Sequence, residues 1–198
     1  MNLAPEAVLH LAAQCAPQAA AETLLAVTRV ESGLDPLAIG VNGPAPRRLR
    51  VPSRSEAITQ AHALISRGAS IDLGLAQINS RNLGRLGLTV ADAFDPCRNL
   101  AAGASLLQVN YQSVRALADD DQSALRAALS LYNTGDRQRG FKNGYVARVE
   151  RSAAGAPALP VGRQAPSTAP QPPAWDAFGD LSPAAFVISP SSRQGDQP

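Results

Sequence analysis

Apolar residues recur at intervals of three and four along most of residues 1–150, which is the spacing of one face of an α-helix. Ser55 and the acidic run 119–121 are typical of helix N-termini. The pattern predicts helices over residues 5–14, 18–32, 55–68, 98–117, about 119–132 and about 140–151. We therefore expect a mostly α domain without an internal repeat.

Two stretches interrupt the helical pattern. Residues 42–54 are rich in proline and arginine, and we interpret them as a solvated loop. In residues 70–83 the amides Gln77 and Asn79 alternate with apolar residues, which fits a short strand or an irregular loop. Asn79 can also cap a helix that follows it. Any β structure should therefore be small and lie around Gln77.

One carboxylate occupies a helical position at which the apolar pattern predicts burial. Steps of three and four residues from Leu24 lead to Val27 and then to Glu31, and Ser32-Gly33 ends the helix. Burial of an unpaired carboxylate raises its pKa, which suits a general acid. The alternative is a partly exposed glutamate in a last helical turn, with no chemical role.

The composition changes near residue 152. Residues 151–198 hold nine of the sixteen prolines, with Ala, Ser, Gln and Gly making up most of the rest. We interpret residues 152–198 as a disordered tail and residues 1–151 as the folded domain. Within the tail, residues 175–188 contain the only tryptophan, as either a docking motif or a transiently ordered patch.

The remaining composition excludes several classes of site. The net charge is +2, and no dense basic run alternates with aromatic residues, so we expect no nucleic-acid binding. No apolar stretch approaches the roughly 18–20 residues of a membrane span. Two histidines and two cysteines without CxxC spacing exclude an ordinary zinc site, and no cofactor is expected. The residues alone leave open whether Cys15 and Cys97 are free or form one disulfide.

Four short stretches, in this order, resemble the catalytic (SLT) domain of the lysozyme-like lytic transglycosylases. They are ES at 31–32, GLAQI at 74–78, LYNTG at 131–135 and the tyrosine at 145. Ala76, Leu131 and Thr134 depart from the residues usual at these positions in the family. The resemblance covers about residues 5–151 and is closest to members that accompany type IV secretion systems, which also carry a proline-rich extension. It implies a lysozyme-like helical domain.

The resemblance implies roles for two carboxylates. Glu31 would be the general acid that protonates the glycosidic oxygen between N-acetylmuramic acid and N-acetylglucosamine in peptidoglycan, and then the base that forms a 1,6-anhydro product. Asp72 lies two residues before Gly74, in a D-x-G-x-x-Q-I-N pattern that also resembles the chicken-type lysozymes. It would be a second catalytic carboxylate, as in a hydrolytic lysozyme, or else only a turn-forming aspartate.

The resemblance also implies a set of residues around the sugar. Gln77 and Asn133 would bind acetamide groups, Tyr145 would donate a hydrogen bond to Glu31, and Ser32 would hold the acid or cap its helix. The expected substrate-binding residues are Ser32, Gln77, Asn79, Tyr132, Asn133 and Tyr145. A third reading, an inactive wall-binding factor, gives no reason for an acid on an apolar helical face.

A substrate outside the cytoplasm implies a location and a redox state. We expect a periplasmic protein whose leader is absent from this sequence, since residues 1–17 lack a basic segment before their apolar run. In that compartment Cys15 and Cys97 become disulfide partners. The expected partners are glycan strands and, through the tail, components of a type IV secretion apparatus.

Overall fold

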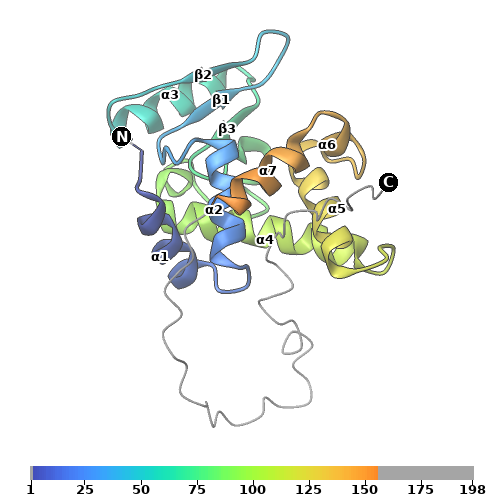
Figure 1. Ribbon diagram of the computed structural model, residues 1–198. Helices are drawn as coiled ribbons and strands as arrows, with labels where there is room; N and C mark the ends of the chain where they lie inside the picture. Colours follow the sequence, from blue (N-terminus) through green and yellow to red (C-terminus); the bar gives the residue numbers. More distant parts are fainter. Residues whose placement is uncertain (1, 156–198) are drawn as a thin grey trace.

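The computed structural model describes residues 2–155, which form a mostly helical domain with one small sheet (Figure 1). The predicted helical fold is confirmed. The helices are α1 (Pro5–Cys15), α2 (Ala21–Glu31), α3 (Arg54–Ser66), α4 (Pro96–Arg115), α5 (Asp121–Thr134), α6 (Arg139–Lys142) and α7 (Tyr145–Ala154). Two short 3₁₀ helices cover Ser80–Asn82 and Asp92–Phe94. The predicted tail, with its aromatic stretch at 175–188, lies outside the described residues apart from 152–155.

The structure corrects two helix boundaries. The helix predicted over 140–151 is two helices, α6 and α7, because Gly144 adopts a left-handed φ of 74° that no helix can continue through. The N-cap of the third helix lies two residues before the predicted cap, and the helix begins at Arg54. Ser53, not Ser55, is its N-cap, and the Ser53 hydroxyl accepts a hydrogen bond from the backbone N–H of Glu56 at 3.2 Å.

A four-stranded antiparallel sheet lies between α2 and α4 in the chain. Its strands are β1 (Ile39–Val41), β2 (Arg47–Leu49), β3 (Ile71–Leu73) and β4 (Ile78–Asn79), in the order β2-β1-β3-β4. The prediction of a solvated loop over 42–54 is therefore wrong for residues 47–49, which pair with β1. Strands of two or three residues are too short to show alternation in the sequence.

The two faces of the sheet differ in chemistry. One row of paired residues is apolar and packs with α3 and Phe94 in a buried cluster; it comprises Leu49, Ile39, Leu73 and Ile78. The next row points to the opposite face because successive strand residues alternate. That row comprises Arg48, Gly40, Asp72 and Asn79. The sheet thus presents a polar row on the side away from its core.

The helices form the rest of the domain around α2. Helix α2 packs against α1 on one side and α7 on the other, while α4 contacts both α1 and α5 (Figure 1). Leu24 and Leu25 of α2 are buried in a cluster with α1, and Val27 is buried in a second cluster with α5 and α7. The C-terminal end of α2 is thereby held between both clusters.

Within residues 2–155, none of the helices combines the length and the apolar character that a membrane span needs.

A disulfide joins the end of α1 to the first turn of α4. Cys15 and Cys97 are bonded, with their Cα atoms 5.4 Å apart and a sequence separation of 82 residues. The bond closes a loop that contains α2, α3 and the whole sheet. It therefore restrains the unfolded chain over much of the domain.

We expect loss of this disulfide to lower the free energy of unfolding by about 2–4 kcal/mol, because the open chain regains loop entropy. The measurement is the denaturant midpoint of the Cys15→Ser, Cys97→Ser double variant against the oxidised protein. The reduced wild-type chain is the matched control and should unfold with the variant. Equal midpoints for oxidised and reduced chains would show that packing alone joins α1 to α4.

Candidate functional site

Glu31 is the last residue of α2 and is only partly exposed. The helix stops there because Gly33 adopts a left-handed φ of 65°. Ser32, the C-cap, is buried, and its hydroxyl donates to the Thr28 carbonyl oxygen at 3.0 Å. Ser32 therefore closes the helix behind the acid, and it does not line either cavity described below.

The surroundings of Glu31 raise its pKa to about 7. The largest cause is desolvation by burial, which disfavours the charged carboxylate. The Tyr145 hydroxyl opposes this by donating to Glu31 Oε1 at 2.6 Å, which stabilises the charged form. The negative charge of Asp72 raises the pKa further, whereas the positive charges of Arg48 and Arg148 lower it. A substantial fraction of Glu31 is therefore protonated at neutral pH.

A tight turn between β3 and β4 carries Gln77 to the site. Gly74 has φ 74°, and a Cβ there would lie 2.3 Å from the Ala93 carbonyl oxygen, so only glycine fits. Gln77 itself has φ 49°, an uncommon value for a residue with a side chain. Its Nε2 donates to the carbonyl oxygens of Gly74 at 2.8 Å and Ala38 at 3.2 Å. The amide nitrogen thus braces the turn, and Gln77 Oε1 lies over Gly40.

Asn99, a buried residue of α4, holds this turn from behind. Its Oδ1 accepts from the backbone N–H of Ala76 at 2.7 Å, and its Nδ2 donates to the carbonyl oxygens of Leu73 at 2.9 Å and Ala93 at 2.8 Å. These bonds satisfy backbone groups that would otherwise be buried without partners. Sequence reasoning missed Asn99; the available signal was an amide directly beside Leu100 in the apolar stripe of α4.

Tyr132 braces the same turn from α5. Its hydroxyl donates to the Ala76 carbonyl oxygen at 2.7 Å, and burial raises its pKa well above the usual range. Helix α4 approaches closely because residue 103 is glycine, where a Cβ would lie 2.8 Å from the Ala76 Cβ. Both flanks of the turn are therefore fixed by contacts to Ala76.

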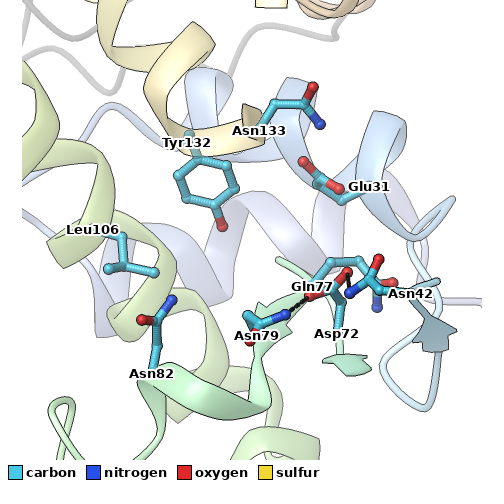
Figure 2. A pocket seen from close by; sticks show the side chains of 9 residues that line it. All are labelled: Glu31, Asn42, Asp72, Gln77, Asn79, Asn82, Leu106, Tyr132 and Asn133. Atoms are coloured by element: carbon cyan, nitrogen blue, oxygen red, sulfur yellow. Dashed lines mark hydrogen bonds between the residues drawn. The ribbon is translucent and has the colours of Figure 1, made fainter. Parts of the chain in front are cut away.

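Asp72 accepts a hydrogen bond on each carboxylate oxygen. Asn79 Nδ2 donates to Oδ1 at 2.7 Å and Asn42 Nδ2 donates to Oδ2 at 2.8 Å (Figure 2). The Asn79 side chain also donates to the Ser70 hydroxyl and accepts from the Arg81 N–H, so it is fully engaged within the protein. Asn79 thus orients Asp72. Asn42, which sequence reasoning missed, performs the same function from the β1 side.

Asn133 connects the groove to the start of α7. It is exposed, and its Oδ1 accepts from Asn143 Nδ2 at 2.9 Å. Asn143 Oδ1 in turn accepts from the backbone N–H of Tyr145 at 2.9 Å. Tyr145, which bonds Glu31, is therefore positioned by Asn143, and Asn143 is in turn bonded to Asn133 in the groove.

Two adjoining cavities meet at the acid. One has a volume of about 220 Å³ and the other about 310 Å³. Both are lined by Glu31, Asn42, Asp72 and Gln77. The smaller is completed by Asn79, Asn82, Leu106, Tyr132 and Asn133 (Figure 2), and the larger by Gly40, Val41, Pro46, Arg47 and Arg48. The shared residues make the cavities two halves of one groove, with Glu31 where the halves join.

The groove brings together most of the residues predicted from the sequence. Glu31, Asp72, Gln77, Asn79, Tyr132 and Asn133 line it, and Tyr145 stands behind Glu31. Ser32 points back into α2, and the disulfide belongs to the junction of α1 and α4. Within residues 2–155 no group of three or more His, Cys, Asp or Glu side chains is arranged to hold a metal ion. The groove can therefore supply one protonated carboxyl group, one carboxylate and several neutral amides.

Comparisons with known proteins agree with this geometry. The model of the transglycosylase SLT domain matches residues 9–154. The type IV secretion system protein virB1 of Brucella suis biovar 1 (strain 1330) is 45% identical over 152 residues, which cover 73% of this chain and 63% of that protein. Protein virB1 of Agrobacterium fabrum (strain C58 / ATCC 33970) is 43% identical over 144 residues, covering 73% of this chain and 58% of that protein.

The chain thus spans less than two thirds of the length of these curated relatives. No solved structure gives a significant match. The matched region contains α2, the sheet, the turn at Gly74–Gln77 and α4 to α7, which together build the groove. The chain belongs to the family of transglycosylase SLT domains.

Proposed function

We propose that the chain cleaves the glycan strands of peptidoglycan as a lytic transglycosylase, with Glu31 as general acid and then as base. The observation that carries the proposal is the position and pKa of Glu31. It lies where the halves of the groove join, and its pKa of about 7 lets it exchange a proton near neutral pH. Membership of the transglycosylase SLT domain family supports the same reaction.

The first step is cleavage of the β-1,4 bond between N-acetylmuramic acid and N-acetylglucosamine. Protonated Glu31 donates its proton to the glycosidic oxygen, and the bond from that oxygen to the anomeric carbon breaks with its electron pair leaving on oxygen. Positive charge then develops at the anomeric carbon. The Asp72 carboxylate lines both halves of the groove, and its negative charge stabilises that cation.

The second step closes the sugar on itself. Glu31, now a carboxylate, removes the proton from the 6-hydroxyl of the muramic acid, and that oxygen bonds to the anomeric carbon. The product is a 1,6-anhydro sugar, no water is consumed, and Glu31 is protonated again. Neutral amides suit the uncharged hydroxyl and acetamide groups of the sugars. Such amides line the smaller half of the groove at Gln77, Asn82 and Asn133.

A lysozyme-type hydrolase that uses Glu31 and Asp72 is the second candidate. It is favoured by one observation, that both carboxylates line the same groove. The Asn42 and Asn79 amides each donate to one oxygen of Asp72, which orients the carboxylate and leaves a lone pair on each oxygen, so these bonds are compatible with both reactions. A non-catalytic wall-binding factor is less well supported, because it has no use for a buried carboxylate that costs stability.

The location and partners form a further part of the proposal. We propose that the chain acts in the periplasm and opens the wall locally for a type IV secretion or conjugation apparatus. The relatives named virB1 include a type IV secretion system protein, and a disulfide suits an oxidising compartment. Contacts with that apparatus are assigned to the tail, residues 152–198, of which 156–198 lie outside the described residues.

The Glu31→Gln variant tests the assignment of the acid. Glutamine keeps the size and hydrogen-bonding oxygen of Glu31 but cannot donate an acidic proton, so digestion of purified peptidoglycan should fall by about 10²–10⁴-fold. Glu56→Gln is the matched control because Glu56 is exposed on α3 and lines neither cavity. Mass spectrometry of the wild-type products should show 1,6-anhydro ends, one water lighter than reducing ends. Normal digestion by Glu31→Gln would refute the assignment, and reducing ends would favour the hydrolase.

Two substitutions should move the alkaline limb of the pH profile of kcat/KM in opposite directions. Tyr145→Phe removes a hydrogen bond that lowers the pKa of Glu31, so the limb should move to higher pH. Asp72→Asn removes a charge that raises this pKa, so the limb should move to lower pH. Tyr111→Phe, at a tyrosine that bonds Asp121 between α4 and α5, should leave the limb in place. Shifts in the same direction would contradict the electrostatics described above.

Glu31→Gln should also be more stable than the wild type at pH 8. The carboxyl pKa is about 7 in the folded protein and near 4.5 when exposed, so stability is full below pH 4.5 and falls as the pH rises towards 7. Glutamine removes this loss, which amounts to up to about 3 kcal/mol. Thermal unfolding at pH 8 and pH 4.5 measures the difference, which should vanish at the lower pH. A variant that is less stable than wild type at pH 8 would show that burial does not penalise the charged form of Glu31.

A further inference from the structure

The larger half of the groove differs in charge from the smaller half. Arg47 and Arg48 of β2 line it, whereas amides, a phenol and Leu106 complete the smaller half. Both arginines are exposed, and within residues 2–155 neither guanidinium group has a hydrogen bond or an ion pair, although the backbones of both residues pair with β1. Several other arginines of the domain are paired, such as Arg98 with Asp92 and Arg126 with Glu150. The larger half therefore adds guanidinium groups without a bonded partner next to Glu31, on the side of the groove away from the amides that complete the smaller half.

The register of the sheet points Arg48 into this half. Arg48 pairs with Gly40, and Gly40 pairs on its other side with Asp72, so all three lie in one row on one face. Neighbouring strands are about 4.8 Å apart, which separates the Cα atoms of Arg48 and Asp72 by about 10 Å. Arg48 also acts on the pKa of Glu31, as expected for a charge that faces the groove.

Gly40 leaves the floor between the two charges open. A Cβ at this position would lie 2.9 Å from Gln77 Oε1, so a side chain would displace the Gln77 amide and fill the groove. With glycine there, a ligand can lie across β1 between Arg48 and Asp72. Its sugar would rest near Asp72 and Glu31 while an attached group extends over Gly40 towards Arg48.

We propose that Arg48 forms a subsite for a carboxylate on the peptide stem of the peptidoglycan strand. This inference rests on the proposed substrate. The N-acetylated sugars of the strand are uncharged, and its free carboxylates belong to the short peptides attached to muramic acid. A guanidinium pairs with a carboxylate through two parallel hydrogen bonds, which a neutral sugar cannot supply. The arginine half of the groove therefore makes the enzyme prefer stem-bearing strands.

Binding tests the subsite without relying on cleavage. In the Glu31→Gln background, the ligands are soluble disaccharide peptides whose stem carboxylates are either free or converted to carboxamides. The free acid should bind about tenfold more tightly, as expected for one charge-assisted contact. Arg48→Gln should abolish this preference, and Arg48→Glu should invert it. Arg50→Gln removes the same charge at an exposed residue outside both cavities and should retain the preference.

Cleavage supplies the second measurement. The ratio of kcat/KM for intact strands to that for strands stripped of their peptides should exceed one for the wild type. It should fall about tenfold in Arg48→Gln and stay unchanged in Arg50→Gln. The subsite is refuted if the carboxylate preference survives in Arg48→Gln. It is also refuted if the protein with Arg48 intact shows no such preference. Selective binding by Glu31→Gln together with no cleavage of either strand by the wild type would uphold the subsite and refute the proposed reaction.

Discussion

Desolvation of a single carboxylate is the constraint on which this site depends. Burial at the end of α2 raises the pKa of Glu31 from 4.5 to about 7, which corresponds to about 3 kcal/mol of disfavoured charge. The Tyr145 hydroxyl limits this effect, so the pKa stops near neutrality, where one group can both give and take a proton. The clusters around α2 and the disulfide offset the cost of holding the acid there.

The turn between β3 and β4, which carries Gln77 into the groove, is held by a second set of contacts. This turn needs two residues with positive φ, Gly74 and Gln77, and such a backbone persists only when its surroundings hold it. Asn99 and Tyr132 bond its buried backbone groups from two helices, and the disulfide at Cys97 lies two residues before Asn99 on α4. The same contacts that stabilise the fold therefore fix the distance between the sheet and the acid.

The sequence predicted what local periodicity and motif order can encode. The helices and the position of Glu31 at the end of an apolar face were found because both depend on residues three or four apart. A small β segment was predicted around Gln77, but β1, β2 and the pairing of the four strands were missed, because the strands are two or three residues long and pair across 5 to 34 residues of sequence. Asn42 and Asn99 were missed for a related reason. Each acts on a partner 23 to 30 residues away, and one polar residue gives no periodic signal.

The polar row of the sheet would link the proposed binding of a stem carboxylate to the protonation of Glu31. Arg48 and Asp72 act on Glu31 with opposite sign, the first lowering and the second raising its pKa. An anion bound at Arg48 would neutralise the charge that favours the carboxylate, so the pKa of Glu31 would rise when the stem peptide occupies the groove. The acid would then be more fully protonated in the complex than in the free protein. Gly40 permits this coupling, because it keeps the space between the two charges open to the ligand.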